Sequence, residues 1–142
     1  MRSVVVGVVV GSLVCLVSLL LLGAVHRYVY GPALAQFGDA DFFTKMTTSG
    51  LIWLILMRVF SAWLGSSVAV RMSDEPHATW TGPVVVLICA LATVMGMGQP
   101  IWSLIVSLVL TLAAGWGVGR AHVGMPLIPG LEQLRDRLND RG

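Results

Sequence analysis

The chain alternates between long apolar runs and short polar segments. Because a bilayer core needs about 20 mostly apolar residues per helix, the pattern predicts membrane spans at about 3–25, 50–70, 80–98 and 101–119. The third span reaches that length only if residues 79–82 lie in the membrane interface. Only Gln99 and Pro100 separate the third and fourth spans, so these two should form a tight antiparallel hairpin. We therefore expect an all-α integral membrane protein, a four-helix transmembrane bundle built from two helical hairpins.

The residues after the fourth span differ in pattern, so we divide the chain into a membrane domain (1–123) and a cytoplasmic tail (124–142). Three leucines of the tail fall on one face of a helix that begins after Pro129, namely Leu131, Leu134 and Leu138. This predicts a short amphipathic helix on the membrane surface. Docking of the same face onto a partner protein is the alternative.

The first apolar run has a competing interpretation as a cleaved signal peptide. Arg2 supplies a positive start and residues 33–36, "ALAQ", offer a cleavage site. However, the apolar part of a secretory signal is about 7 to 15 residues long, and this run covers 23 residues, from Ser3 to Val25. We expect the run to be retained as a span.

Arginine and lysine positions predict the orientation, because they concentrate in cytoplasmic loops. With four spans, one side holds six arginines: Arg2, Arg71, Arg120, Arg135, Arg137 and Arg141. The other side holds Arg27 and Lys45. Both termini should therefore be cytoplasmic.

Aromatic residues near the span ends fit two interfacial belts. The predicted outer anchors are Tyr28, Tyr30, Trp53 and Trp102, and the predicted inner anchors are Trp80 and Trp116.

Composition agrees with a membrane location. Only 11% of the 142 residues are charged, against about 25% in soluble domains, so the chain lacks the polar surface to face water. A net charge of +2, scattered along the chain, gives no basis for nucleic-acid binding. Cys15 and Cys89 lie in apolar runs without metal-type spacing and are interpreted as buried hydrophobic residues.

Small residues recur four apart in three spans, a spacing that lets membrane helices approach closely. We expect helix packing at Gly7, Gly11, Ser61, Gly65, Ala69, Ala113, Gly115, Gly117 and Gly119. The spacing favours packing within the bundle and leaves open contacts between copies.

Arg58, in the run "LIWLILMRVF", is the only ionisable side chain inside a long apolar stretch. A charge at this depth costs about 2.5–3.5 kcal/mol on insertion scales and usually has a partner or a route to water. The candidate partners are Asp39 or Asp41 from the outer loop, helix carbonyls, or an acid on another subunit. A structural role, docking to another protein and substrate binding are all open.

The sequence offers no chemistry for catalysis. His26, His77 and His122 form no metal-type or triad spacing, and no phosphate-binding loop follows a strand. The spans contain no Asp or Glu, which excludes the mechanism of small four-helix multidrug exporters that use a membrane carboxylate. We predict no enzyme activity, no cofactor and no metal.

Two arginine-capped stretches, "AWLGSSVAVR" and "AAGWGVGR", and the turn "QPIW" resemble a group of small bacterial four-span membrane proteins of unassigned function. The resemblance implies the fold and a location in the bacterial inner membrane. It implies no activity, substrate or catalytic residue.

Two functions are therefore expected. The first is a non-catalytic accessory or scaffolding subunit of a larger membrane complex, with membrane lipids and that complex as partners. The alternative is a small homo-oligomeric transporter or channel with Arg58 facing the pathway. Its polar lining would come from Ser12, Ser18, Thr93, Ser103, Ser107 and Thr111.

Overall fold

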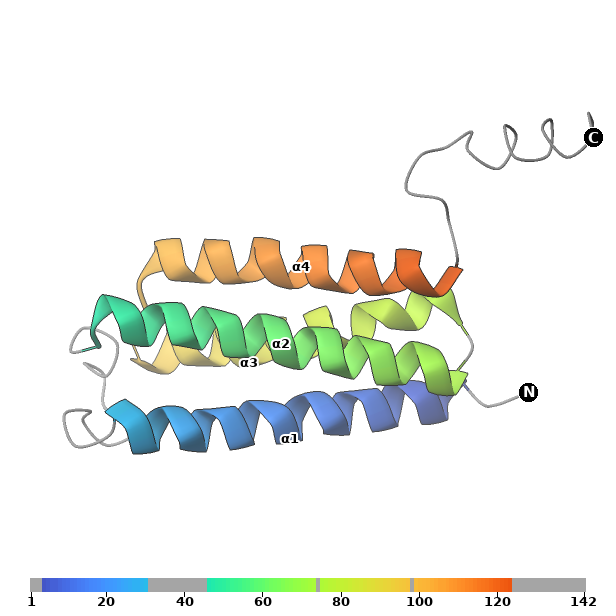
Figure 1. The fold of residues 1–142 in the computed structure, drawn as a ribbon. Coiled ribbons are helices and arrows are strands. Elements are labelled where there is room, and N and C mark those ends of the chain that lie inside the picture. Colours follow the sequence, from blue (N-terminus) through green and yellow to red (C-terminus); the bar gives the residue numbers. More distant parts are fainter. Residues whose placement is uncertain (1–3, 31–45, 74, 98, 124–142) are drawn as a thin grey trace, which may run out of the picture.

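The computed structural model describes residues 4–30, 46–73, 75–97 and 99–123. In these ranges the chain is entirely helical apart from short connections, which confirms the all-α prediction (Figure 1). The elements are α1 (Val4–Tyr30), α2 (Thr48–Ser73), the 3₁₀ helix η2 (Pro76–Trp80), α3 (Thr81–Met97) and α4 (Ile101–Val123). Together the described helices supply four segments long and apolar enough to cross a membrane, which is the pattern of a multi-pass membrane protein.

The helices continue past the apolar runs that predicted them. α1 extends through His26 and Arg27 to Tyr30, and α4 extends through Arg120 and His122 to Val123. Basic residues in the last turn interact favourably with the negative end of the helix dipole, which helps polar sequence to stay helical. The predicted tail helix with Leu131, Leu134 and Leu138 lies outside the described residues.

Local signals fix where the helices begin. Thr47 caps α2, since its Oγ1 accepts a hydrogen bond of 3.3 Å from the backbone N–H of Gly50. Pro76 begins η2 and Pro83 lies in the first turn of α3, where its missing N–H leaves no helix bond unmade. Pro100 precedes α4, and its carbonyl accepts from the backbone N–H of Ser103 at 3.1 Å.

α2 is the central helix of the bundle. It packs against α1, α3, η2 and α4, whereas α1 and α4 make no contact with each other over their described lengths. Figure 1 shows α1 on one side and α4 on the other, with α2 and α3 between them. The bundle therefore has two separate flanks.

The α1–α2 interface is a close approach of two backbones. A Cβ added to Gly11 would lie 2.6 Å from the Ala69 Cβ and 2.7 Å from the Gly65 carbonyl oxygen, and one added to Gly65 would lie 2.7 Å from the Cys15 Cβ. Gly7 meets the same part of α2 one turn earlier. Glycine is needed here because any side chain would separate the helices.

Two further glycines allow the second half of the chain to close. A Cβ at Gly82 would meet the Ala62 carbonyl oxygen and lie 2.6 Å from Ser66 Oγ, so α3 begins directly against α2. A Cβ at Gly115 would lie 2.6 Å from Pro83 Cγ. The four-residue spacing predicts the contact at Gly115 but not the one at Gly82, which falls among the residues expected in the membrane interface.

The predicted small residues of α4 divide between two sides of the helix. Gly115 is buried and Gly119 lies against Thr79, whereas Ala113 and Gly117 face outward, and nothing lies within 4 Å of a Cβ added to Gly117. Residues two apart differ by about 200° around a helix, so the two pairs cannot meet the same neighbour.

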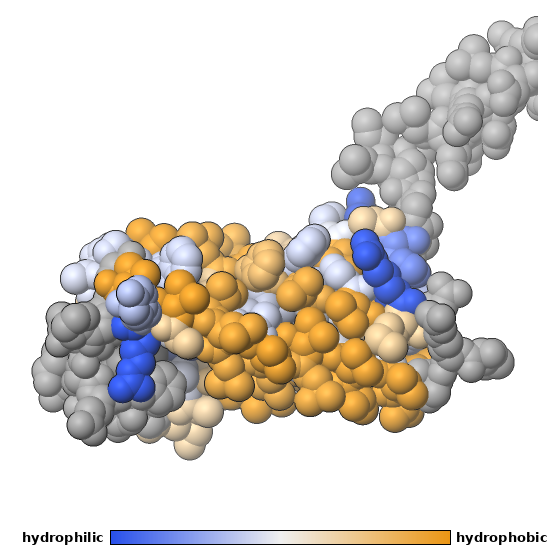
Figure 2. All heavy atoms as spheres, turned by 60° about the horizontal axis from the view of Figure 1, so that its bottom comes forward, coloured by the Kyte–Doolittle hydropathy of each residue, from blue (hydrophilic) through white to orange (hydrophobic). Residues whose placement is uncertain are grey.

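The exterior is apolar along the middle of the bundle. Figure 2 shows a continuous hydrophobic surface between hydrophilic patches near the two ends. Exposed valines and leucines of α1, such as Val9, Leu13 and Leu20, contribute to it. This distribution matches a hydrocarbon core with water at both ends.

Candidate functional site

The strongest candidate site is built around Arg58, which lies on α2 with 3% of its surface exposed. Its Nη2 donates hydrogen bonds to Thr93 Oγ1 at 2.9 Å and to Gln99 Oε1 at 3.0 Å. Thr93 belongs to α3, and Gln99 lies in the connection between α3 and α4. Gln99 Nε2 in turn donates to Ser103 Oγ of α4 at 3.0 Å. We call Arg58, Thr93, Gln99 and Ser103 the arginine cluster.

The hydroxyl groups of the cluster are satisfied on both sides. Thr93 Oγ1 accepts from the guanidinium and donates to the Ala90 carbonyl at 2.7 Å, with Gln99 Oε1 as a second acceptor at 3.1 Å. Ser103 Oγ accepts from Gln99 and donates to the Pro100 carbonyl at 2.8 Å. These hydrogen bonds connect α2 to α3, to the α3–α4 connection and to α4, so the cluster fixes α2 to the α3–α4 hairpin.

The positive charge of the cluster is not neutralised within the described residues. All the acceptors of Arg58 are neutral, and its Nη1 is buried without a hydrogen-bond partner there. The predicted partners Asp39 and Asp41 lie outside the described residues. The guanidinium is inside the bundle, so an acid on a laterally bound protein has no direct access to it.

A line of small hydroxyls continues from the cluster along α4. Ser103, Ser107 and Thr111 follow one another at four-residue spacing, and each is at most 1% exposed. Ser61 of α2 is also fully buried. Ser61 Oγ and Ser107 Oγ have no partner among the described residues, whereas Thr111 Oγ1 donates to the Ser107 carbonyl at 2.6 Å. We call these four residues the polar seam.

The seam and the cluster include four of the six residues predicted to line a pathway. The other two, Ser12 and Ser18, belong to α1, and Ser18 Oγ donates to the Cys15 carbonyl of its own helix at 2.9 Å. Gln99 was missed by sequence analysis because a Gln-Pro pair between two apolar runs indicated only a turn. The signal in the sequence that could have identified Gln99 is its position at the turn of the predicted hairpin.

A second hydroxyl network closes the opposite half of the bundle. Ser66 Oγ of α2 donates to the Thr79 carbonyl at 2.6 Å, and Thr79 Oγ1 donates to the Gly115 carbonyl of α4. Thr79 is 5% exposed. η2 is therefore held between α2 and α4, and the two networks fasten α2 to α4 near both ends.

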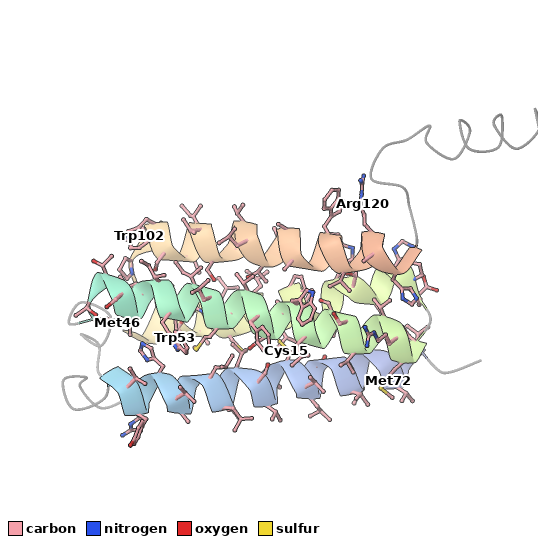
Figure 3. The ribbon with its side chains drawn as sticks, in the orientation of Figure 1. Cys15, Met46, Trp53, Met72, Trp102 and Arg120 are labelled. Atoms are coloured by element: carbon pink, nitrogen blue, oxygen red, sulfur yellow. The ribbon has the colours of Figure 1, made fainter. Side chains whose placement is uncertain are left out.

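The predicted aromatic anchors lie near the two ends of the bundle. Figure 3 shows Trp102 and Trp53 towards the end where α4 and α2 begin. Trp102 is exposed and Trp53 is half-buried. Tyr28, Trp80 and Trp116 are also exposed, and the Arg120 guanidinium carbon lies 4.2 Å from the centroid of the Trp116 ring. The Tyr30 side chain lies outside the described residues.

All three histidines lie in helical elements. His26 is part of α1 and is 5% exposed, because α1 continues beyond the apolar run. His77 and His122 are exposed, in η2 and α4. Within the described ranges, no group of three or more His, Cys, Asp or Glu residues is arranged to hold a metal ion.

The fold and its buried arginine define a four-helix, multi-pass membrane protein. Comparison with protein-family models, with curated proteins and with solved structures found no match. The resemblance to small bacterial four-span proteins therefore stays a prediction, and no relative supplies a function for the arginine cluster.

Proposed function

We propose that the protein is a non-catalytic integral membrane protein that serves as an accessory or scaffolding subunit of a larger membrane complex. The observation that supports this is the separation of polar and apolar groups. The buried polar side chains lie inside the bundle, and the two flanks formed by α1 and α4 are mostly apolar. Such a molecule meets other molecules mainly within the plane of the membrane. We place it in the bacterial inner membrane with both termini cytoplasmic.

The flank formed by α1 is the surface we assign to a partner protein. α1 has the highest hydropathy of the four candidate spans, and only 22% of its most apolar stretch is buried inside the bundle. Between Val4 and Val25 its exposed side chains, such as Val9, Leu13 and Leu20, are all apolar. In lipid, helices associate through van der Waals packing rather than a hydrophobic gain, so a partner has to match the shape of this flank.

Arg58 has a structural role in this proposal. Docking through an acid of another protein requires the guanidinium on a flank, whereas it is bonded to Thr93 and Gln99 inside the bundle. Loss of co-purification in an Arg58 variant would therefore report a changed fold rather than a lost contact.

Photo-crosslinking on the α1 flank tests the accessory role. A photoreactive amino acid at Leu13 or Leu20 should give products heavier than the chain itself in native membranes. The same amino acid at Val86, which is 2% exposed, is the control and should give none. If the flank positions react only with lipid, and the chain purified in mild detergent contains no second protein, the accessory role is refuted.

A second function is favoured by one specific observation: Arg58 Nη1 is buried and has no hydrogen-bond partner among the described residues. A buried cation held only by neutral acceptors attracts anions, since a low dielectric strengthens charge interactions. The seam provides hydroxyls from α2 and α4 beyond it. An anion transporter or channel, with Arg58 facing the pathway, is therefore the alternative proposal.

Anion flux into liposomes distinguishes the two. Under the alternative proposal, wild type should conduct a small anion such as chloride and Arg58→Met should not, while both variants remain folded. Arg27→Met, which removes an exposed arginine from the last turn of α1, is the matched control and should conduct like wild type. Equal flux from wild type, Arg58→Met and empty liposomes refutes the transport role and leaves the accessory role standing.

A further inference from the structure

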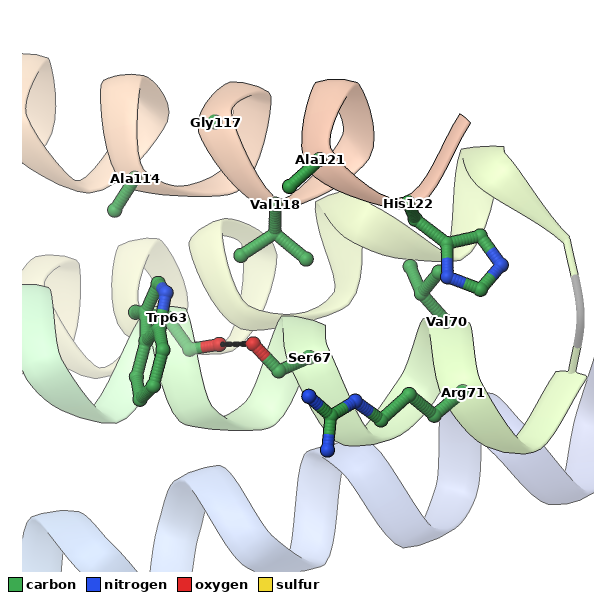
Figure 4. Close-up of a pocket in the computed structure, with 9 residues that line it drawn as sticks. All are labelled: Trp63, Ser67, Val70, Arg71, Ala114, Gly117, Val118, Ala121 and His122. Atoms are coloured by element: carbon green, nitrogen blue, oxygen red, sulfur yellow. Dashed lines mark hydrogen bonds between the residues drawn. The ribbon is translucent and has the colours of Figure 1, made fainter. Parts of the chain in front are cut away.

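A groove between α2 and α4 is unaccounted for by either proposed function. It has a volume of about 380 Å³ and lies near the ends of the two helices (Figure 4). Trp63, Val70 and Arg71 line it from α2, and Gly117, Val118 and His122 are among its residues from α4. The volume falls within the range of small-molecule sites, about 300–1,000 Å³.

The groove runs along α2 and α4 for about the thickness of one lipid leaflet. Trp63 and Arg71 are eight residues apart on α2, which corresponds to about 12 Å along a helix. Ala114 and His122 bound it over the same length on α4. Half of a hydrocarbon core of about 30 Å is about 15 Å. The groove therefore extends from the helix ends towards the bilayer centre.

The floor of the groove is apolar and lacks large side chains. Val70 and Val118 are buried beneath it, and Gly117 leaves open space where a side chain would otherwise lie. The one hydroxyl in its lining, Ser67 Oγ, already donates to the Trp63 carbonyl at 2.7 Å. A flexible hydrocarbon chain suits this floor, because it requires no hydrogen bonds.

The end of the groove is basic. Arg71 is exposed, and among the described residues it has no hydrogen bond or ion pair; His122 of α4 lines the same part of the groove, and the Arg71 side chain extends back along α2 towards Ser67 (Figure 4). The guanidinium matches phosphate oxygens in geometry and charge. The C-termini of α2 and α4 both lie near this end, and the partial negative charge of about one half at each opposes an anion. Arg71 offsets this by contacting the phosphate directly through charge-assisted hydrogen bonds.

We propose that this groove binds one anionic phospholipid, with an acyl chain along the floor from Trp63 to Val70 and the phosphate against Arg71. The apolar floor, its length of about one leaflet and a cation without a partner among the described residues are the features of a phospholipid site. A second copy of the chain fits less well, because a helix with side chains is about 10–12 Å wide and Trp63 stands at one end of the groove.

Native mass spectrometry of the full chain in detergent, titrated with phosphatidylglycerol or phosphatidylcholine of the same acyl chains, tests the proposal. One phosphatidylglycerol should bind with clear preference over phosphatidylcholine. Arg71→Gln should weaken that binding about tenfold, as expected for loss of a charge-assisted hydrogen bond. Arg120→Gln, which removes the same charge from a residue stacked on Trp116 outside the groove, should bind like wild type.

A second variant tests the groove separately from the charge. Gly117→Leu, whose Cβ enters open space, fills part of the groove and should reduce binding of both lipids. Equal effects of Arg71→Gln and Arg120→Gln would overturn the proposal, because they would indicate general surface charge. A lipid-free dimer that Gly117→Leu converts to monomer would also overturn it, since the groove would then belong to a second copy.

Discussion

Replacing Gln99 with leucine removes an acceptor from a buried cation while leaving the cation in place. Arg58 Nη2 would keep Thr93 as its only partner, and Ser103 would lose the amide that donates to it. A hydrogen bond to a charged group contributes about 1.5–3 kcal/mol. We therefore expect Gln99→Leu to lower the free energy of unfolding by about 2–3 kcal/mol, with little compensation because Gln99 is 4% exposed.

Replacing Arg58 itself should be better tolerated than replacing its partner. Arg58→Met removes the charge along with its desolvation penalty, and buried ions replaced by apolar residues of similar volume often leave stability unchanged or increased. Thr93 and Gln99 remain within 3.1 Å of each other and retain a hydrogen bond. We expect Arg58→Met to lie within about 1 kcal/mol of wild type.

The double variant Arg58→Met/Gln99→Leu completes the comparison. It should be more stable than Gln99→Leu alone, because no buried cation is left short of acceptors. The assay is equilibrium unfolding in mixed micelles with increasing dodecyl sulfate, followed by tryptophan fluorescence and helical circular dichroism on the same samples.

The order of stabilities decides the outcome. If Arg58→Met is less stable than Gln99→Leu, the arginine contributes a net attraction that neutral acceptors do not explain, and an anionic partner inside the bundle becomes necessary. If the double variant is as unstable as Gln99→Leu, Gln99 stabilises the hairpin without involving the guanidinium.

Three further changes probe helix contacts, each measured as the midpoint of the same unfolding transition. Gly82→Ala should lower the free energy of unfolding by about 1–3 kcal/mol, because its Cβ meets helix backbone that cannot rotate away. Its control, Gly117→Ala, faces open space and should leave stability unchanged or slightly increased. Equal effects of the two substitutions would refute the close α2–α3 approach. Gly11→Leu should prevent α1 from packing against α2. Gly23→Leu should fold normally, because nothing lies within 4 Å of a Cβ added to Gly23. A Gly11→Leu variant that folds with the wild-type midpoint would contradict the close α1–α2 interface. Thr79→Val should cost about 1 kcal/mol through its lost hydroxyl bond, and no change would show that η2 is held by packing alone.

The spans were predictable from sequence because lipid leaves a backbone no solvent partners, so long apolar runs must be helical. Helix ends were less predictable. α1 continues through His26 to Tyr30. The mixed polar and apolar residues of this stretch match neither the pattern of a span nor that of a loop, so the end of the helix could not be predicted. Four-residue spacing predicted contact glycines, and Gly11 and Gly65 do lie in a tight interface.

The arginine cluster was only partly predictable. The depth of Arg58 required acceptors, and carboxylates were the natural expectation. The acceptors in the structure are a threonine and a glutamine on two other segments, and their convergence depends on how the hairpin packs against α2. The small residues of α4 depend on packing in the same way. The four-residue spacing fits both the series that contains Gly115 and the series that contains Gly117, and only the packing of α4 determines that Gly115 is the buried one.

The sequence separation between Arg58 and Gln99 has a consequence for biosynthesis. The two residues are 41 positions apart, and at about 5–20 residues per second the ribosome needs roughly 2–8 s to reach the acceptor after making the cation. During that interval α2 occupies the membrane or its insertion machinery with an arginine that has no hairpin to bond, at a cost of about 2.5–3.5 kcal/mol on insertion scales. Once α3 and α4 are inserted, Arg58 can form its hydrogen bonds to Thr93 and Gln99. Insertion of the last hairpin is therefore the step that fixes α2 in its final position.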